Sequence, residues 1–323
     1  MPQRRANELA APVTTETRAY IASFCESVSA LHGHSVLSDH LMLDLLDVGC
    51  DPPPIAALGG VEGDTSVVAL ASQSNEGWVI EVVANNDHDL APPRTVTSEI
   101  VSAVIGALRR EGVPKVTWWI RDHDRWAESV AQGIGFTEDR RLLQMRMRLD
   151  GTVRQRFRDE GAHTRDFDEI RDIEPWLTLN NAAFSDHDEQ GGWTRESLER
   201  RLHASWFKAE DFRVHERSRG ESDGDTREMA GFCWTKRHEP NSHQPAMGEI
   251  YVIAVAPDLA GRGLGRQLAM SGFAHLADQG LQIGMLYVDS DNEAALSMYE
   301  SLGLTVHHTD RAYVMNLEYT SAD

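Results

Sequence analysis

A glycine-rich turn between an apolar strand and a helix is the part of the sequence best suited to bind a ligand. A strand is predicted over residues 248–255 (GEIYVIAV) and a helix over 264–278. Three glycines alternate in the turn between them: Gly261, Gly263 and Gly265. Unpaired amides at a helix start attract anions, and Arg262 and Arg266 add positive charge there. The turn therefore predicts a site for a phosphate-like anion.

Two better-known glycine motifs do not fit this turn. A dinucleotide-binding fingerprint needs a further glycine five positions after the first, but Arg266 and Leu268 occupy the two places where it would fall. A P-loop needs Gly-Lys-Ser/Thr, which does not occur in the turn. The remaining alternative is a turn that merely joins a strand to a helix.

The composition excludes several classes of protein. The 323 residues suit two domains, and a hydrophobic content of 41% supplies two cores. A formal charge of −20, from 31 basic and 51 acidic residues, disfavours sequence-independent binding to nucleic acid. No apolar run reaches the roughly 18 residues of a membrane span, and neither a signal peptide nor metal-ligand spacing is visible. We expect a cytoplasmic monomer with no metal and no membrane partner.

A repeated order of elements organises the chain. The first half predicts helices at 20–31 and 38–47 (with Ser38 as N-cap), strands at 67–70 and 78–83, a helix at 97–111, a strand at 115–120, a helix at 124–133 and a strand at 141–149. The second half predicts strand, helix, strand, helix and strand at 248–255, 264–278, 282–288, 292–302 and 310–318.

Landmarks in the two halves keep a nearly constant spacing. Gly303 follows Gly135 by 303 − 135 = 168 residues, and Tyr287 follows Trp119 by 287 − 119 = 168. The spacing is 248 − 77 = 171 for the glycines that open the central strands. A repeat of this length indicates a duplicated domain. We predict a mobile N-terminus over 1–16, domains over 17–150 and 151–323, and a long mobile hairpin loop over 217–228 (RSRGESDGDTRE).

The second half resembles the GCN5-related N-acetyltransferase (GNAT) family. In that family an Arg/Gln-x-x-Gly-x-Gly/Ala loop holds the pyrophosphate of coenzyme A, and residues 263–265 (GLG) fill its second part. Ala260 replaces the usual Arg or Gln, for which Arg262 offers another donor. Asn292 and Tyr299 match two residues of a later helix in the family. The resemblance implies an α/β (α+β) fold of two tandem GNAT-like domains, each a mixed, largely antiparallel central sheet flanked by helices.

Within that family, the chain is similar to the mycothiol synthases in particular. The resemblance rests on the duplicated layout and on residues 184–194 (FSDHDEQGGWT), 231–236 (GFCWTK) and 248–251 (GEIY). These enzymes transfer acetyl from acetyl-CoA to the cysteinyl amine of a cysteine–glucosamine–inositol conjugate. The resemblance therefore implies acetyl-CoA as co-substrate and this amino-sugar/inositol conjugate as acceptor.

The same resemblance implies two groups of residues that contact coenzyme A. They are Ile253, Ala254, Val255, Ala260, Gly261, Arg262, Gly263, Leu264, Gly265 and Arg266, and Asn292, Glu293, Ala294, Ala295, Leu296 and Ser297. Asn292 is expected to cap its helix in either interpretation.

Glu249 is the candidate general base. A carboxylate beside an acyl donor accepts the amine proton, directly or through water. An α-amine has a pKa of about 7.7–8.0, so a modest base suffices. The alternative is a strand-end glutamate that faces solvent. Tyr299 is the candidate acid that protonates the departing thiolate, as the resemblance implies; the alternative is a core tyrosine packed beside Leu296 and Leu302.

Five polar residues are implied to hold the acceptor: Asp39, Glu189, Lys236, Glu249 and Tyr287. Carboxylates suit vicinal hydroxyls and a cationic amine. Asp39 is equally typical of a first-turn helix acid, and Lys236 of a solvated strand-end lysine. Cys233 is more typical of a small buried hydrophobe than of a nucleophile.

The first half departs from the pattern of the second. Residues 85–94 (NNDHDLAPPR) contain no Gly-x-Gly, Asp87 and Asp89 would repel a pyrophosphate, and two prolines remove backbone donors. Trp78 follows Gly77 where Glu249 follows Gly248. We predict that this half is catalytically inactive, lacks the phosphate site and forms a wall of the acceptor site, to which Asp39 contributes.

Two other functions stay open. One is a GNAT enzyme for another amine, such as a protein N-terminus or an aminoglycoside, and the other is a non-catalytic acyl-CoA-binding module. Glu249 and Tyr299 favour catalysis, whereas Glu189 and Lys236 favour the cysteinyl conjugate over a peptide.

Overall fold

The structure is a computed structural model that describes residues 10–32, 36–60, 65–74, 77–85, 94–121, 124–185, 191–218, 227–240 and 244–317. The chain divides into two compact units. The first extends to Leu142 and takes up the chain again from Thr309, and the second holds Leu143–Pro240 and Pro245–His308. Within the described residues, no helix combines the length and apolar character needed to cross a membrane.

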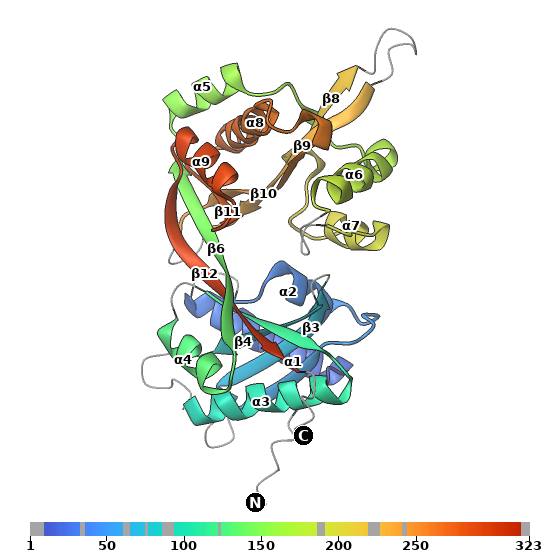
Figure 1. Cartoon of the computed structure of the whole chain (residues 1–323), viewed down its shortest axis with the longest axis vertical. Coiled ribbons are helices and arrows are strands. Elements are labelled where there is room, and N and C mark those ends of the chain that lie inside the picture. Colours follow the sequence, from blue (N-terminus) through green and yellow to red (C-terminus); the bar gives the residue numbers. More distant parts are fainter. Residues whose placement is uncertain are drawn as a thin grey trace, which may run out of the picture. The chain divides into compact units, whose positions relative to one another are not determined.

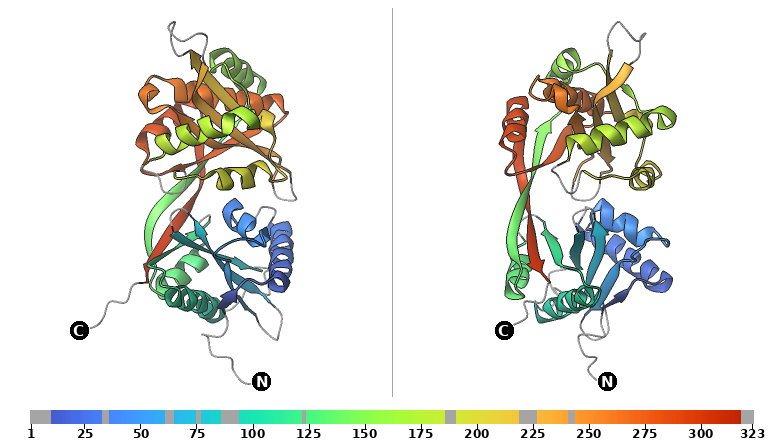
Figure 2. Two further views of the ribbon diagram at one scale, coloured as in Figure 1. Left: turned by 90° about the vertical axis from the view of Figure 1, so that its right-hand side faces the viewer. Right: turned by 45° about the vertical axis from the view of Figure 1, so that its right-hand side comes forward.

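The first unit is a mixed sheet between two layers of helices (Figure 2). Its strands, in spatial order, are β1 (Ala10–Pro12), β2 (Ile55–Gly59), β3 (Val67–Ser74), β4 (Gly77–Ala84), β5 (Lys115–Ile120) and the part of β12 (Thr305–Asn316) from Thr309 onward. One face packs against α1 (Thr15–His32) and α2 (Asp39–Leu46), and the other against α3 (Arg94–Arg110) and α4 (Arg125–Gly133). Because both faces are covered, the consecutive residues Val67–Ala71 of β3 are all apolar and buried.

The second unit repeats this layered plan (Figure 1). Its strands, in spatial order, are β6 (Thr137–Arg148), β11 (Ile283–Asp289), β10 (Met247–Val255), β9 (Arg227–His238), β8 (Phe212–Ser218) and β7 (Arg165–Asp166). Helices α5 (Gly151–Glu160), α8 (Leu264–Asp278) and α9 (Glu293–Leu302) cover one face. Helices α6 (Glu169–Ala183) and α7 (Arg195–Leu202) cover the other, over an aromatic core in which Phe212 and Trp234 stack with ring centroids 4.4 Å apart.

Each unit contains one parallel strand pair joined through a helix, β4–β5 through α3 and β10–β11 through α8. The remaining ladders of β1–β5 and β7–β10 are antiparallel, as is the β5–β12 ladder. These sheets confirm the predicted fold class. The predicted helices and strands of the repeat are also present, including the Ser38 cap, whose side chain accepts from the amide of Leu41.

The last strand of each predicted repeat does not stay with its own unit. Residues Arg311–Asn316 of β12 pair with Ile120–Lys115 of β5 in the first unit, whereas β6 from Leu143 onward belongs to the second. The predicted division at 150/151 therefore misses an exchange of strands. Periodicity identifies a strand but not its partner, because the pairing depends on which sheet edge is open.

Two segments predicted to be mobile are partly ordered. Residues Ala10–Pro12 form an edge strand against Ile55–Ala57, and α1 begins at Thr15; residues 1–9 lie outside the described part of the chain. The two ends of the predicted 217–228 loop are paired, since Arg217 and Ser218 lie opposite Glu228 and Arg227 in the β8–β9 ladder; residues 219–226 lie outside the described part of the chain. Backbone pairing fixes both segments although their side chains are polar or small.

A buried carboxylate links three elements of the second unit. Asp211, at the end of the short helix η2 (Ala209–Asp211), accepts from Arg237 Nε at 2.7 Å and lies 2.7 Å from His275 Nε2. Burial alone would raise the pKa of Asp211, but hydrogen bonds from His275 and Arg237 outweigh it and hold that pKa below its usual range.

We expect Asp211→Asn to lower the free energy of unfolding by about 3–5 kcal/mol, because it removes a buried carboxylate charge from its ion pair with Arg237 and its hydrogen bond with His275. The lowered folded-state pKa stabilises the protein above the unfolded value of about 3.9, and this contribution is lost as the pH falls through the folded value. Thermal melts of the wild type and of Asp211→Asn across this acidic range should show that the difference between their melting temperatures becomes smaller as the pH falls. A difference in melting temperature that does not change with pH would contradict the stabilising role of the ionised Asp211 carboxylate.

Candidate active site

A break in strand pairing opens one edge of β10. Its parallel ladder with β11 covers Gly248–Ile250, opposite Gly284–Leu286, and no pairing between the two strands is recorded beyond it among the described residues. On the other side, β10 stays paired with β9, and the register skips Tyr251. This β-bulge turns the strand away from β11. The backbone of Tyr251–Val255 is therefore open to a ligand along the edge toward β11, and this stretch includes the predicted contacts Ile253, Ala254 and Val255.

The open edge leads directly into the N-terminus of α8. Gly263 is the N-cap residue with φ +84°, and it supplies no side-chain cap. Gly261 also has a positive φ, +72°, which favours glycine. Among the described residues, no acceptor is recorded for the first three amides of the helix, and the first closing bond is Gln267 N–H to the Gly263 carbonyl at 3.2 Å. Such amides, with the helix dipole behind them, form an anion site.

The two arginines of this turn differ in their exposure to solvent. Arg262 and Ala260 are exposed, whereas Arg266 is half-buried, with its Nη1 3.9 Å from Glu160. The pKa of Asp258 is lowered, mainly by a hydrogen bond from Arg217 and to a smaller extent by the charge of Arg262. Arg262 is thus the exposed cation closest in sequence to the uncapped amides, as the anion-site interpretation requires.

Glu249 does not face solvent. It is 8% exposed, and its Oε2 lies 2.7 Å from Nε2 of His238 on β9. Glu249 and Lys236 are cross-strand partners in the β9–β10 ladder, so their side chains share one face of the sheet. The alternative of a solvated strand-end glutamate is therefore wrong.

Lys236 is also buried, at 8% exposure, so the alternative of a solvated lysine is wrong too. Its Nζ lies 4.6 Å from the ring centroid of Trp206 and 5.6 Å from that of Tyr251. The Tyr251 hydroxyl accepts from Arg201 Nε of α7 at 3.2 Å. The sheet face around Glu249 thus combines aromatic walls with cationic groups, a surface suited to a polyhydroxylated ligand.

Tyr287 projects from β11 on this same face, because Met285, two residues earlier, is the ladder partner of Glu249. It is partly exposed, and its hydroxyl accepts from Gln144 Nε2 at 2.7 Å. The structure therefore brings Lys236, Glu249 and Tyr287 to one face across three adjacent strands.

Tyr299 lies on the other side of the sheet, in the core between α8, α9 and the strands. It is 6% exposed and packs in one cluster with Leu302, so its packing in the core is shown, and its role as the acid stays a prediction. Burial, with a smaller effect from Cys233, raises the pKa of its phenol. Cys233 itself is fully buried, and burial raises its pKa to about 12, as expected of a structural thiol.

The remaining candidates are placed as follows. Asn292 caps α9 by accepting from Ala295 N–H at 3.1 Å, so residues 292–297 form the first turns of that helix. Asp39 is the first residue of α2 in the first unit. Glu189 and the acidic segment 86–93 lie outside the described residues. Among the described residues, no cluster of His, Cys, Asp and Glu is arranged to hold a metal ion.

Sequence reasoning missed His238, Tyr251, Trp206 and Arg201. A signal for His238 exists: it stands two residues after Lys236, so a strand through both places them on one face. Reasoning from the sequence also misaligned the first half by one residue. The parallel ladders equate Val79, not Trp78, with Glu249, because Trp78 and Gly248 are the residues that open the two ladders.

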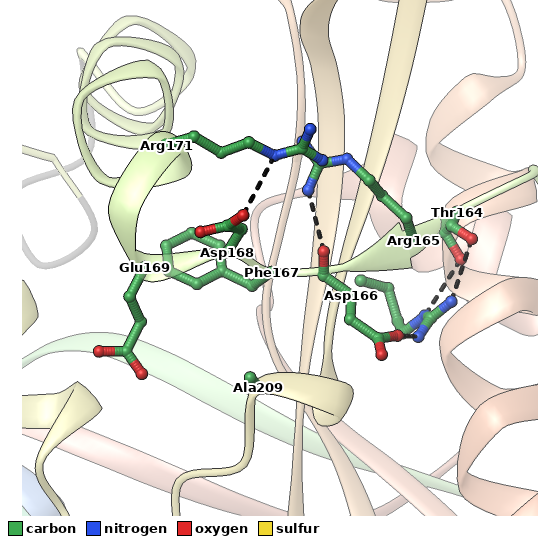
Figure 3. Close-up of a pocket in the computed structure, with 9 residues that line it drawn as sticks. Thr164, Arg165, Asp166, Phe167, Asp168, Glu169, Arg171 and Ala209 are labelled. Atoms are coloured by element: carbon green, nitrogen blue, oxygen red, sulfur yellow. Dashed lines mark hydrogen bonds and ion pairs between the residues drawn. The ribbon is translucent and has the colours of Figure 1, made fainter.

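A separate hollow of 760 Å³ lies near the start of α6, lined by Thr164–Glu169, Arg171, Ala209 and Arg213 (Figure 3). Its arginines are engaged by nearby carboxylates. Arg165 binds Asp172 at 2.6 Å, and Arg213 binds Asp166. It contains none of the predicted site residues, and its three arginines pair with carboxylates of the protein.

Comparisons with known proteins agree with this geometry. Residues 174–304 match the Acetyltransferase (GNAT) family. The mycothiol acetyltransferase of Paenarthrobacter aurescens is 35% identical over 281 residues, covering 87% of this chain and 80% of that protein. The mycothiol acetyltransferase of Acidimicrobium ferrooxidans is 33% identical over 306 residues, covering 93% and 94%.

Solved structures show the same fold at low sequence identity. A GCN5-related N-acetyltransferase from Sphaerobacter thermophilus superposes with a TM-score of 0.62 at 16% identity, over 96% of both chains. A tandem GNAT protein from the clavulanic acid biosynthesis pathway gives a TM-score of 0.62 at 10% identity, over 97% of this chain and 99% of that one. The match to a tandem protein over almost the whole chain agrees with a duplicated fold.

Proposed function

Because the chain belongs to the mycothiol acetyltransferase family, we propose that it transfers acetyl from acetyl-CoA to the cysteinyl α-amine of a cysteine–glucosamine–inositol conjugate, forming mycothiol. The observation that carries the proposal is the continuity of the second unit's site. The buried carboxylate of Glu249 precedes a bulge, an open strand edge and an uncapped helix start along a single stretch of chain.

Acetyl-CoA would bind along this stretch. The unpaired amides of α8 and the side chain of Arg262 suit its pyrophosphate. The open backbone of β10 after the bulge suits the amides of the pantetheine arm and offers N–H groups to the thioester oxygen. The acceptor would bind on the α6–α7 face, where Lys236, Glu249 and Tyr287 lie together.

The chemistry removes two protons from the nitrogen and supplies one to the departing sulfur, and Glu249 passes the proton that it takes up to solvent. Glu249 accepts a proton from the α-ammonium, directly or through water, and the neutral nitrogen attacks the thioester carbon. When the tetrahedral intermediate collapses, the C–S bond breaks and Tyr299 gives its proton to the leaving thiolate. The phenol then regains a proton from the acetylated nitrogen through solvent.

We also propose that the first unit does not catalyse. Val79 occupies the position that corresponds to Glu249. The β3–β4 ladder runs from Val67↔Ala84 to Ser74↔Gly77 without the register shift that bends β10. It lacks both the base and the bulge.

Acetyl transfer to the purified cysteinyl conjugate tests this function. Mass spectrometry should show one acetyl group added to nitrogen, at a kcat/KM well above that for an aminoglycoside or a peptide N-terminus. Binding of acetyl-CoA with no turnover on any acceptor would support a non-catalytic module instead.

We expect Tyr299→Phe to lower kcat by roughly 10²-fold or more, the usual contribution of a positioned acid. The raised pKa of this phenol keeps it protonated throughout the neutral range, so the loss should not vary between about pH 6 and pH 9. Steady-state kinetics across that range provide the measurement. Wild-type kcat in the variant would leave Tyr299 with a packing role alone.

A further inference from the structure

A histidine contacts the proposed base on its oxygen Oε2. His238 is the last residue of β9, and its Nε2 lies 2.7 Å from Glu249 Oε2 on β10. An ionised carboxylate only accepts hydrogen bonds, so in that state Nε2 carries the hydrogen and donates it. Among the described residues, no other hydrogen-bond partner of the Glu249 carboxylate is recorded.

The surroundings of this pair make it more than a chance surface contact. The Glu249 side chain is 11% exposed and the His238 side chain 31%, so the bond is partly shielded from water while the imidazole still reaches solvent. Lys236 is the cross-strand neighbour of Glu249, and Arg201 approaches the same face from α7 through Tyr251. Arg237, between Lys236 and His238, is bonded instead to Asp211 and Glu210.

We propose that His238 is a positioning residue for the acetyl transfer. Its hydrogen bond holds Oε2 and so directs the other oxygen of Glu249, Oε1, toward the incoming amine or its bridging water. The terminal torsion of a glutamate is broad and poorly restrained by itself, so a fixed donor restricts the carboxylate to its productive orientation. This inference rests on the proposed function, because it assumes that Glu249 is the base.

Kinetics of the full chain test the proposal. His238→Ala should lower kcat roughly 10- to 100-fold, the range expected when a hydrogen bond to a charged group is lost, with the KM for acetyl-CoA unchanged. His238→Gln should recover most of kcat, because its amide N–H₂ can reach the same oxygen. If His238→Ala does not fold, as judged by its melting curve, His238→Phe keeps the ring volume without the donor and replaces it.

A matched control and a double variant complete the design. His215→Ala removes another strand histidine of this unit, whose ring contacts the carbonyl of His163 at 2.8 Å, and it should leave kcat unchanged. In the Glu249→Gln background, His238→Ala should have no further effect on kcat.

The outcomes separate the two proposals. Wild-type kcat in Glu249→Gln would refute the role of the base itself. Two results would overturn the positioning role and leave the proposed function intact. One is a wild-type kcat in His238→Ala while Glu249→Gln loses activity. The other is that His238→Gln does not recover the kcat lost in His238→Ala.

Discussion

Glu249→Gln should lower kcat by roughly 10²- to 10⁴-fold, the usual contribution of a general base. The amide has the shape of the carboxylate but cannot take up the amine proton. Since Glu249 lies outside the turn at α8, the dissociation constant of acetyl-CoA should stay within about twofold of the wild type. Single-turnover rates and calorimetric titration with coenzyme A measure the two quantities separately.

The matched control for this variant is Glu216→Gln. Glu216 is a partly buried glutamate of β8 that binds Arg165 at 2.6 Å, and that hydrogen bond lowers its pKa. Loss of this ion pair in Glu216→Gln should lower the melting temperature without changing kcat. If Glu249→Gln and Glu216→Gln had the same kcat, Glu249 would not be the general base.

Gly263→Ala should weaken the binding of coenzyme A at least tenfold, or about 1.4 kcal/mol. An alanine at a φ of +84° is strained by roughly 1–2 kcal/mol, which favours a different path for the turn. Among the described residues, no atom lies within 4 Å of the added methyl group, so in the native conformation it would project into the space proposed for the pyrophosphate.

Gly280→Ala provides a control with the same strain. Gly280 follows the end of α8 and has a φ of +86°, and no atom of the described part of the chain lies within 4 Å of an added Cβ. Both variants should lose similar stability in thermal melts, but the affinity for coenzyme A should fall in Gly263→Ala alone. Equal affinities by calorimetry would show that the pyrophosphate does not bind at this turn.

The features that the sequence predicted correctly are local ones. The glycines of the turn, the Asn292 cap and the Ser38 cap each act within a few residues of chain, so residue type and spacing suffice to identify them. The duplicated element order also follows from periodicity, and the 168-residue spacing of Trp119 and Tyr287 agrees with the equivalent positions of β5 and β11.

The features that the sequence left open all depend on contacts between distant residues. Strand register and the choice of strand partner decide four of these features. They are the sheet that β12 joins, the bulge at Tyr251, the burial of Lys236 and the hydrogen bond from His238 to Glu249. One residue of slip in a strand turns every side chain to the opposite face, and no local preference fixes that register. The sequence alone therefore determined the glycine turn at the start of α8 and the caps of α2 and α9, whereas only the tertiary structure decided which side chains surround the proposed base.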